Sequence, residues 1–96
     1  MSRRVVYRFR LYVADDALNS ARAASNLTAL CREHLAGRHE IEVVDVFLHP
    51  ERALADEIYM TPTLVRLAPA PGRRIVGSLS DTIAVLQALG LEKGAG

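Results

Sequence analysis

Cysteine, tryptophan and long apolar runs are scarce or missing in this chain of 96 residues. The one cysteine, Cys31, excludes an internal disulfide, and the ligands of a structural zinc site are lacking as well. Because tryptophan is absent and aromatic residues make up 5% of the chain, the core must be built from aliphatic side chains. No apolar run approaches the roughly 18 residues that cross a bilayer, and the N-terminus lacks the apolar segment of a signal peptide. These absences predict a cytosolic (cytoplasmic) protein that makes no membrane contact.

An excess of charge of one sign is also lacking, since the formal net charge is +1. A dominant nucleic-acid role normally needs a strongly basic face, so this balance argues against nucleic acid as a partner. Half of the residues are apolar, which is enough for one domain with its own core. We expect a single domain over 1–96, with flexible ends at 1–5 and 92–96.

The first half of the chain has the pattern of a βαβ unit. Residues 7–13 alternate between two faces, which predicts a strand with Tyr7 and Phe9 on one face and Tyr12 on the other. Residues 18–35 carry apolar side chains at helical spacing and predict a helix whose cap is Asp16 or Asn19. The expected inner face of this helix consists of Ala23, Leu27, Leu30, Cys31 and Leu35. Residues 41–46 are rich in β-branched side chains and predict a second strand, buried and parallel to the first.

The second half predicts a short helix, a β-hairpin and a closing helix. Pro50 suits the first turn of a short helix that runs to Ile58. Strands over 63–67 and 73–76 flank a turn, 68–72, that is rich in proline and glycine. Ser80 is the expected cap of the last helix, and its inner face is expected to consist of Ile83, Leu86 and Leu89. The predicted order βαβαββα is an α/β fold with the topology of thioredoxin.

The Thr61–Pro62 pair precedes a β-branched run, which is where thioredoxin-like folds place a cis-proline. The alternative is an ordinary trans proline that opens a strand, since only about 5–6% of X–Pro bonds in folded proteins are cis. In a redox thioredoxin this proline faces a Cys-x-x-Cys motif, and no such motif occurs here. We therefore expect a protein that binds a partner and is not an enzyme.

The remaining reactive side chains have simpler structural explanations. Cys31 shares helical spacing with leucines, so a buried small hydrophobic residue is favoured over a redox sensor. The histidines fit surface positions better than a metal site, because their spacing matches no compact ligand set; they are His34, His39 and His49.

Each of the three aspartates Asp15, Asp16 and Asp45 has two possible interpretations. Asp15 and Asp16 occupy the place of the thioredoxin cysteines, but a helix start favours negative charge, so capping is preferred over an acid/base pair. Asp45 is expected at the exposed end of its strand; the alternative is a buried carboxylate, which would need a partner or a shifted pKa.

Five sequence segments together resemble the KaiB family of circadian-clock proteins, in order from about Tyr7 to Leu91. The segments are Leu11-Tyr12-Val13-Ala14, Asn19-Ser20-x-Arg22-Ala23, Val43-Val44-Asp45-Val46, Thr61-Pro62-Thr63-Leu64 and Arg73-Arg74-Ile75-Val76-Gly77-x-Leu79-Ser80. The related thioredoxin-like sensor domain of the clock histidine kinase shares part of this pattern. The long acidic tail of the family's cyanobacterial members is absent from this sequence, which weighs against a tetramer.

The resemblance implies a non-enzymatic regulator without cofactor or metal. KaiB-like proteins bind the N-terminal ATPase ring of the hexameric ATPase KaiC, and some then capture KaiA. Family members switch between a thioredoxin-like state that binds KaiC and a βαββααβ state, rearranged in its C-terminal half, that forms dimers or tetramers. Residues 80–89 are rich in good helix formers, which favours the thioredoxin-like state. The alternatives are a signalling or stress adaptor with another partner, a sensor module acting on a histidine kinase, and a thiol oxidoreductase.

The resemblance also implies which residues carry the function. The partner-binding residues carried over from the family are Arg22, Thr63, Arg66, Arg73 and Arg74. Arginine suits the recognition of carboxylates, and the alternative for each arginine is solvated surface charge. The candidates for a role in fold switching are Pro62, Pro69 and Pro71.

Overall fold

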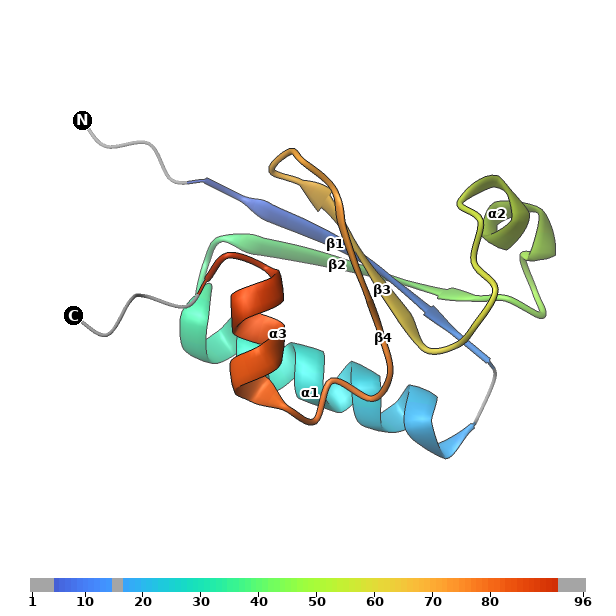
Figure 1. Cartoon of the computed structure of the whole chain (residues 1–96), viewed down its shortest axis with the longest axis horizontal. Coiled ribbons are helices and arrows are strands. Elements are labelled where there is room, and N and C mark those ends of the chain that lie inside the picture. Colours follow the sequence, from blue (N-terminus) through green and yellow to red (C-terminus); the bar gives the residue numbers. More distant parts are fainter. Residues whose placement is uncertain (1–4, 15–16, 92–96) are drawn as a thin grey trace.

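Seven elements follow one another in a computed structural model that describes residues 5–14 and 17–91 (Figure 1). They are β1 (Tyr7–Val13), α1 (Leu18–His34), β2 (His39–Asp45), α2 (Pro50–Ala55), β3 (Thr63–Ala68), β4 (Arg73–Val76) and α3 (Thr82–Ala88). The predicted order βαβαββα is confirmed. Asp15 and Asp16 and most of the two expected flexible ends lie outside the described residues.

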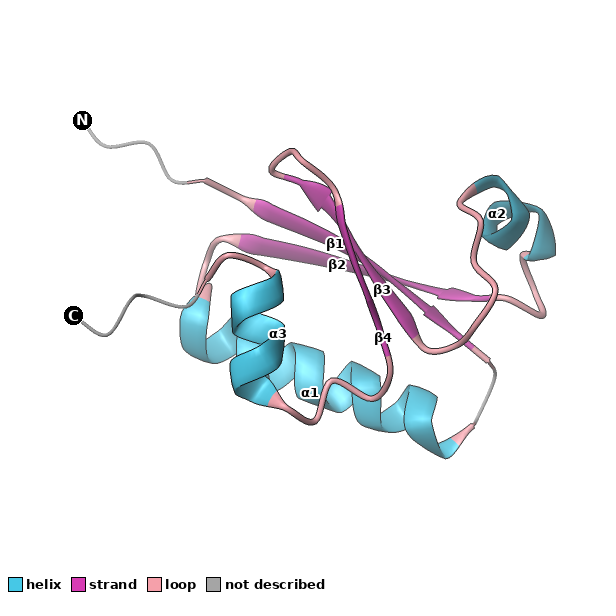
Figure 2. Cartoon of the chain, in the orientation of Figure 1, coloured by secondary structure: helices cyan, strands magenta, loops and turns pink. Residues whose placement is uncertain are grey.

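The four strands form one sheet in the order β2-β1-β3-β4 (Figure 2). β1 and β2 are parallel, as a βαβ unit requires, while β3 runs antiparallel to β1 and β4 antiparallel to β3. β2 and β4 are therefore the two edges of the sheet. Helices α1 and α3 lie along one face, and α2 lies toward the other face near one end.

Side chains that alternate along β1 supply two separate cores. Phe9, Leu11 and Val13 pack against α1 and α3 in the larger cluster, together with the buried leucines of both helices. Tyr12 points to the opposite face and forms a smaller cluster with Val44, Ala53 and Val65. Because Tyr12 is fully buried, the sheet is covered on both faces at this end.

Two predictions about burial are wrong. β2 was expected to be buried, but it lies at the edge, where Val44 is its one buried residue and Val43 is 54% exposed. Ile83 was expected on the inner face of the last helix, but it is 63% exposed. The buried side of α3 instead consists of Val85 and Leu86, followed by Leu89 at the C-cap.

The helix caps also differ from the predictions. Asp81 rather than Ser80 caps α3, and its Oδ1 accepts a hydrogen bond of 3.1 Å from the amide of Ala84. α1 begins after Ala17 without a side-chain cap, so Asn19 lies inside the helix. Ser20 instead accepts a hydrogen bond of 3.0 Å from the amide of Ala14 at the end of β1.

The Thr61–Pro62 peptide bond is cis, as expected for a thioredoxin-like fold. Pro62 is buried next to the first residue of β3. The Ala68–Pro69 and Ala70–Pro71 bonds in the β3–β4 turn are also cis. β4 ends at Val76 and is followed by Gly77, whose φ of 120° is a conformation that essentially only glycine adopts.

Candidate partner-binding surface

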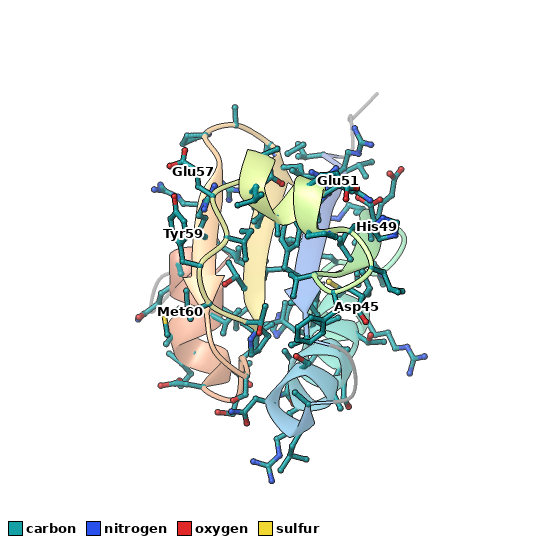
Figure 3. The ribbon with its side chains drawn as sticks, turned by 90° about the vertical axis from the view of Figure 1, so that its right-hand side faces the viewer. Asp45, His49, Glu51, Glu57, Tyr59 and Met60 are labelled. Atoms are coloured by element: carbon teal, nitrogen blue, oxygen red, sulfur yellow. The ribbon has the colours of Figure 1, made fainter. Side chains whose placement is uncertain are left out.

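Large apolar side chains are concentrated on the surface of the segment around α2. Five of the twelve exposed large hydrophobic residues in the described part of the chain fall between positions 47 and 60: Phe47, Leu48, Leu54, Tyr59 and Met60. Figure 3 shows this end of the molecule, with Tyr59 and Met60 on the segment that leads from α2 to β3. We call this group the α2-end surface. Single exposed apolar residues are ordinary, but several large apolar side chains exposed along one segment mark that segment as a candidate protein-binding site.

A shallow hollow of about 190 Å³ lies beside this surface. Ile58, Tyr59 and Met60 line it from one side, and Arg74 and Val76 of β4 line it from the other. Tyr59 is 81% exposed and Met60 is 63% exposed, so both are accessible to a partner.

A network of charged side chains fastens α2 to the sheet. The Glu42 carboxylate on β2 accepts hydrogen bonds from Arg10 Nε at 2.7 Å and from Arg52 of α2 at 2.9 Å. Arg10 Nη1 also reaches the Asp56 carboxylate at 3.1 Å, and the Tyr12 hydroxyl donates to the same carboxylate. The network spans β1, β2 and α2, so it holds the α2-end surface in one position.

The pKa shifts of the two carboxyl groups in this network favour their charged forms. Hydrogen bonds from Arg52 and Arg10 lower the pKa of Glu42 from its ordinary value of 4.5 to about 2. The pKa of Asp56 is also lowered, chiefly by the hydrogen bond from Tyr12. Burial raises the pKa of Tyr12, and the hydrogen bond to Asp56 raises it further. Both carboxylates are therefore ionised at neutral pH, and the arrangement stabilises structure rather than moving protons.

Two of the predicted binding residues lie next to the α2-end surface. Arg74 is exposed and donates hydrogen bonds to the carbonyl oxygens of Glu57, at 3.0 Å, and Asp56. Thr63 is buried, and its hydroxyl donates to the carbonyl of Met60 at 2.5 Å. These contacts tie the segment after α2 to β3 and β4.

The structure does not bring the four predicted arginines into one patch. Arg22 is exposed on α1, which covers the opposite face of the sheet from α2. Arg73 is exposed on β4, whereas Arg66 is only 6% exposed. Arg66 Nη1 and Nη2 donate hydrogen bonds of 2.6 Å to the carbonyls of Leu89 and Pro71, so this arginine joins parts of the fold instead of facing a partner.

The apolar members of the α2-end surface were not predicted as binding residues. For four of the five members the sequence signal is an apolar side chain just outside a regular element, which neither helical nor strand periodicity would bury, whereas Leu54 lies within α2. Phe47 and Leu48 follow β2, and Tyr59 and Met60 precede β3. Such positions could have been recognised as candidates for an interface.

The remaining sequence candidates lie at structural or surface positions. Cys31 is fully buried, as expected, and burial raises the pKa of its thiol to about 11. The Asp45 carboxylate lies half-buried at the end of β2, where it accepts a hydrogen bond of 2.8 Å from the amide of Phe47. His34 and His49 are exposed, while His39 is half-buried with Nδ1 2.9 Å from the carbonyl of Leu35.

Residues 5–14 and 17–91 contain neither a cluster of metal ligands nor a helix that could cross a membrane. No group of three or more histidine, cysteine, aspartate or glutamate side chains there could hold a metal ion. Within the same residues, no helix is both long and apolar enough to cross a membrane.

Comparison with known sequences gives a consistent result. The KaiB domain family matches residues 10–91. The circadian clock oscillator protein KaiB of Prochlorococcus marinus (strain MIT 9313) is 43% identical over 91 residues, which cover 95% of this chain and 76% of that protein. KaiB of Synechococcus elongatus is 42% identical over 94 residues, or 98% of this chain and 92% of that protein. The circadian clock protein KaiB3 of Synechocystis is 39% identical over 83 residues, covering 86% and 79%.

Comparison with solved structures identifies the same fold class. The N-terminal domain of Synechococcus elongatus SasA superposes with a TM-score of 0.73 at 19% identity, covering 100% of this chain and 94% of that one. Mitochondrial thioredoxin 3 of Saccharomyces cerevisiae superposes with a TM-score of 0.71 at 18% identity, covering 91% and 80%. At these identities the likeness concerns the fold alone, which is thioredoxin-like.

Proposed function

The chain belongs to the KaiB family of clock regulators, which are not enzymes, and we propose that it binds the N-terminal ATPase ring of a KaiC-like hexamer. The thioredoxin-like arrangement is the binding state in this proposal. The βαββααβ arrangement of the family is the alternative state, in which the C-terminal half is rebuilt and the chain forms dimers or tetramers.

The observation that carries the proposal is the α2-end surface. Interfaces depend on a few aromatic, apolar and arginine side chains surrounded by weaker contacts. Tyr59 and Met60 supply exposed apolar anchors, and Arg74 lies across the small hollow from them. No other stretch of similar length in the described residues exposes as many large apolar side chains.

The charged network adds to the suitability of this surface. Arg52 within α2 and Asp56 at its C-cap are hydrogen-bonded to side chains of the sheet, so the segment does not need to be ordered when a partner arrives. Binding by a preorganised surface avoids part of the entropic cost of association.

A co-elution experiment with a purified KaiC hexamer in ATP tests the proposal. We expect the wild-type chain to co-elute at micromolar concentrations after incubation for hours. Tyr59→Ala should weaken binding at least about tenfold, as for the loss of an aromatic anchor. Ile83→Ala is the matched control, because Ile83 is 63% exposed but lies on α3. Absence of a wild-type complex, or equal loss in both variants, would contradict the proposal.

A second protein partner is favoured by the position of β2. Within the part of the chain that the structure describes, this strand pairs with β1 alone, so one side of it is free along His39–Asp45. A free edge can accept a strand from another protein, and a KaiA-like protein or a histidine kinase is the partner class that the family suggests. Addition of such a protein to the KaiC complex should give a larger species on the same column. A KaiA-like protein that leaves the elution volume unchanged would exclude it as the second partner.

A further inference from the structure

β4 forms the opposite edge of the sheet, and the direction of its backbone groups follows from one hydrogen bond. The amide of Gly77 donates to the carbonyl of Pro62 at 2.9 Å. Backbone groups alternate in direction along an antiparallel strand, so those of Ile75 also face β3. The N–H and C=O groups of Arg74 and Val76 therefore point away from the sheet. Among the described residues, no backbone hydrogen bond reaches them from outside β4.

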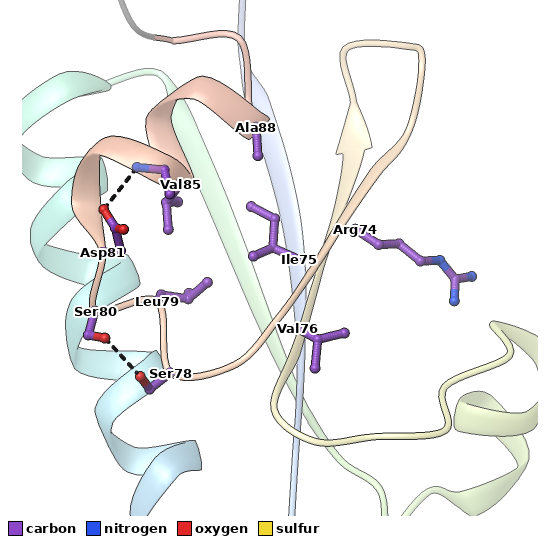
Figure 4. A pocket seen from close by; sticks show the side chains of 10 residues that line it. Arg74, Ile75, Val76, Ser78, Leu79, Ser80, Asp81, Val85 and Ala88 are labelled. Carbon is purple, nitrogen blue, oxygen red and sulfur yellow. Dashed lines mark hydrogen bonds between the residues drawn. The ribbon is translucent and has the colours of Figure 1, made fainter.

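Two hollows flank this free edge, one on each side of the sheet. The larger, of about 500 Å³, lies between β4 and α3. Figure 4 shows Ile75 of β4 and Val85 and Ala88 of α3 around this hollow. The smaller, of about 190 Å³, is the hollow beside Tyr59 and Met60. Arg74 and Val76 border both hollows.

We propose that an extended segment of a partner protein adds to β4 as a fifth strand. Side chains of a strand point alternately to its two faces, so one set would enter the hollow against α3 and the other set the hollow at Tyr59. The free N–H and C=O groups of Arg74 and Val76 would supply the main-chain hydrogen bonds. β4 has four residues, so the added strand has about four to six residues.

The charges along β4 indicate the composition of the partner segment. Arg73 is exposed, and Arg74 donates hydrogen bonds to the carbonyl oxygens of Glu57 and Asp56. The nearby Asp56 carboxylate also attracts Arg74, but its own hydrogen bonds come from Arg10 and Tyr12. Glu57 and Asp81 line the two hollows, but neither carboxylate forms an ion pair with these arginines. The segment therefore carries aspartate or glutamate next to small apolar residues. A second copy of the chain would bring two more arginines to the same edge, so it is disfavoured.

The proposal goes beyond KaiC binding and can be tested with the chain alone. Two synthetic hexapeptides, capped at both ends, alternate valine with threonine and carry either glutamate or lysine at each terminus. Titration into isotope-labelled protein, followed by NMR, should slow the hydrogen exchange of the Arg74 and Val76 amides. The Ile75 amide, which already faces β3, should change little. The glutamate peptide should bind at least about tenfold more tightly than the lysine peptide.

Two substitutions at Val76 separate the backbone contact from the side chain. Proline is tolerated on an edge strand where its missing N–H faces solvent, so Val76→Pro should fold but lose at least about tenfold in peptide affinity. Val76→Thr keeps the N–H and should retain binding. The exchange measurement on the wild type needs no variant and decides the matter if Val76→Pro does not fold. Unchanged exchange at Arg74 and Val76 at millimolar peptide, protection along β2 instead, or dimerisation through β4 would overturn the proposal.

Discussion

Arg66 connects three parts of the fold through one buried guanidinium group. It donates to the carbonyl of Leu89 at the end of α3 and to that of Pro71 in the β3–β4 turn, and it lies 6.0 Å from the centre of the Tyr7 ring. The negative end of the α3 dipole and the ring face both favour a cation at this place. Its Nε has no hydrogen-bond partner among the described residues, so the burial is only partly compensated.

Arg66→Met tests this role. Loss of the guanidinium leaves two carbonyl oxygens without their donors, and we expect the free energy of unfolding to fall by about 2–4 kcal/mol. Urea unfolding measures the change. Arg73→Met is the matched control, since Arg73 is exposed on the adjacent strand, and its effect should stay within about 0.5 kcal/mol. Equal effects of the two substitutions would show that Arg66 has no special structural role.

The position of Arg66 also shows where prediction at single residues fails. The family resemblance placed it with the surface arginines. Side-chain alternation puts it on the same face as Leu64, toward α3, where a charge is tolerated only because carbonyl groups of distant segments meet there. These carbonyl groups are brought together by tertiary packing, which the periodicity of one strand cannot predict.

At the scale of elements, the regular patterns were predicted closely and the ends less so. β1 and β4 begin and end at the predicted residues, because alternation and flanking turn residues define them. α2 ends at Ala55 rather than Ile58 because Glu57 adopts a φ of 56°. The amides of Glu57 and Ile58 then bond the carbonyls of Leu54 and Ala53, which is a Schellman motif formed without glycine.

The cap of α3 yields a prediction at this scale. Asp81→Ala removes the acceptor for the amide of Ala84 and should lower the free energy of unfolding by about 1 kcal/mol. Ser80→Ala should have a smaller effect, because the Ser80 hydroxyl accepts a hydrogen bond of 3.2 Å from the exposed Ser78 hydroxyl rather than from a helix amide. Thermal unfolding of the two variants distinguishes them. A larger loss for Ser80→Ala would restore the cap predicted from the sequence.

At the scale of the molecule, the Arg10–Glu42–Arg52 network joins β2, the centre of the sheet and α2. A carboxyl group whose pKa is lower in the folded chain than in the unfolded chain stabilises the fold above its unfolded pKa. That contribution is lost as the pH falls toward the folded pKa. For Glu42 this stabilisation is lost as the pH falls from about 4.5 to about 2. Its side chain is 47% exposed, so solvent screening limits the size of the effect.

We therefore expect Glu42→Gln to be less stable than the wild type at pH 6 and to approach it at pH 2.5. Urea unfolding at the two pH values measures the difference. Glu40→Gln is the control, because Glu40 forms one exposed ion pair with Arg8 at 3.3 Å instead of a shared contact with two arginines. Its stability should follow that of the wild type more closely. The same pH dependence in both variants would contradict the role of the network.

Only part of the candidate surface could be predicted from the sequence, again because exposure depends on tertiary packing. Thr63 and Arg74 were predicted as binding residues, and the structure places both beside the α2-end surface. Tyr59 and Met60 were not predicted as binding residues, because the sequence alone does not decide whether an apolar residue in a loop is buried or exposed. Their exposure follows from how α2 is fixed above the sheet.

The burial of Cys31 has a practical consequence. A sulfhydryl reagent needs both access and a thiolate, and this sulfur lacks both while α1 stays on the sheet. Alkylation of Cys31 therefore requires α1 to separate from the sheet. The rate of alkylation thus reports how often this local opening occurs, and the measurement needs no dye or engineered tag.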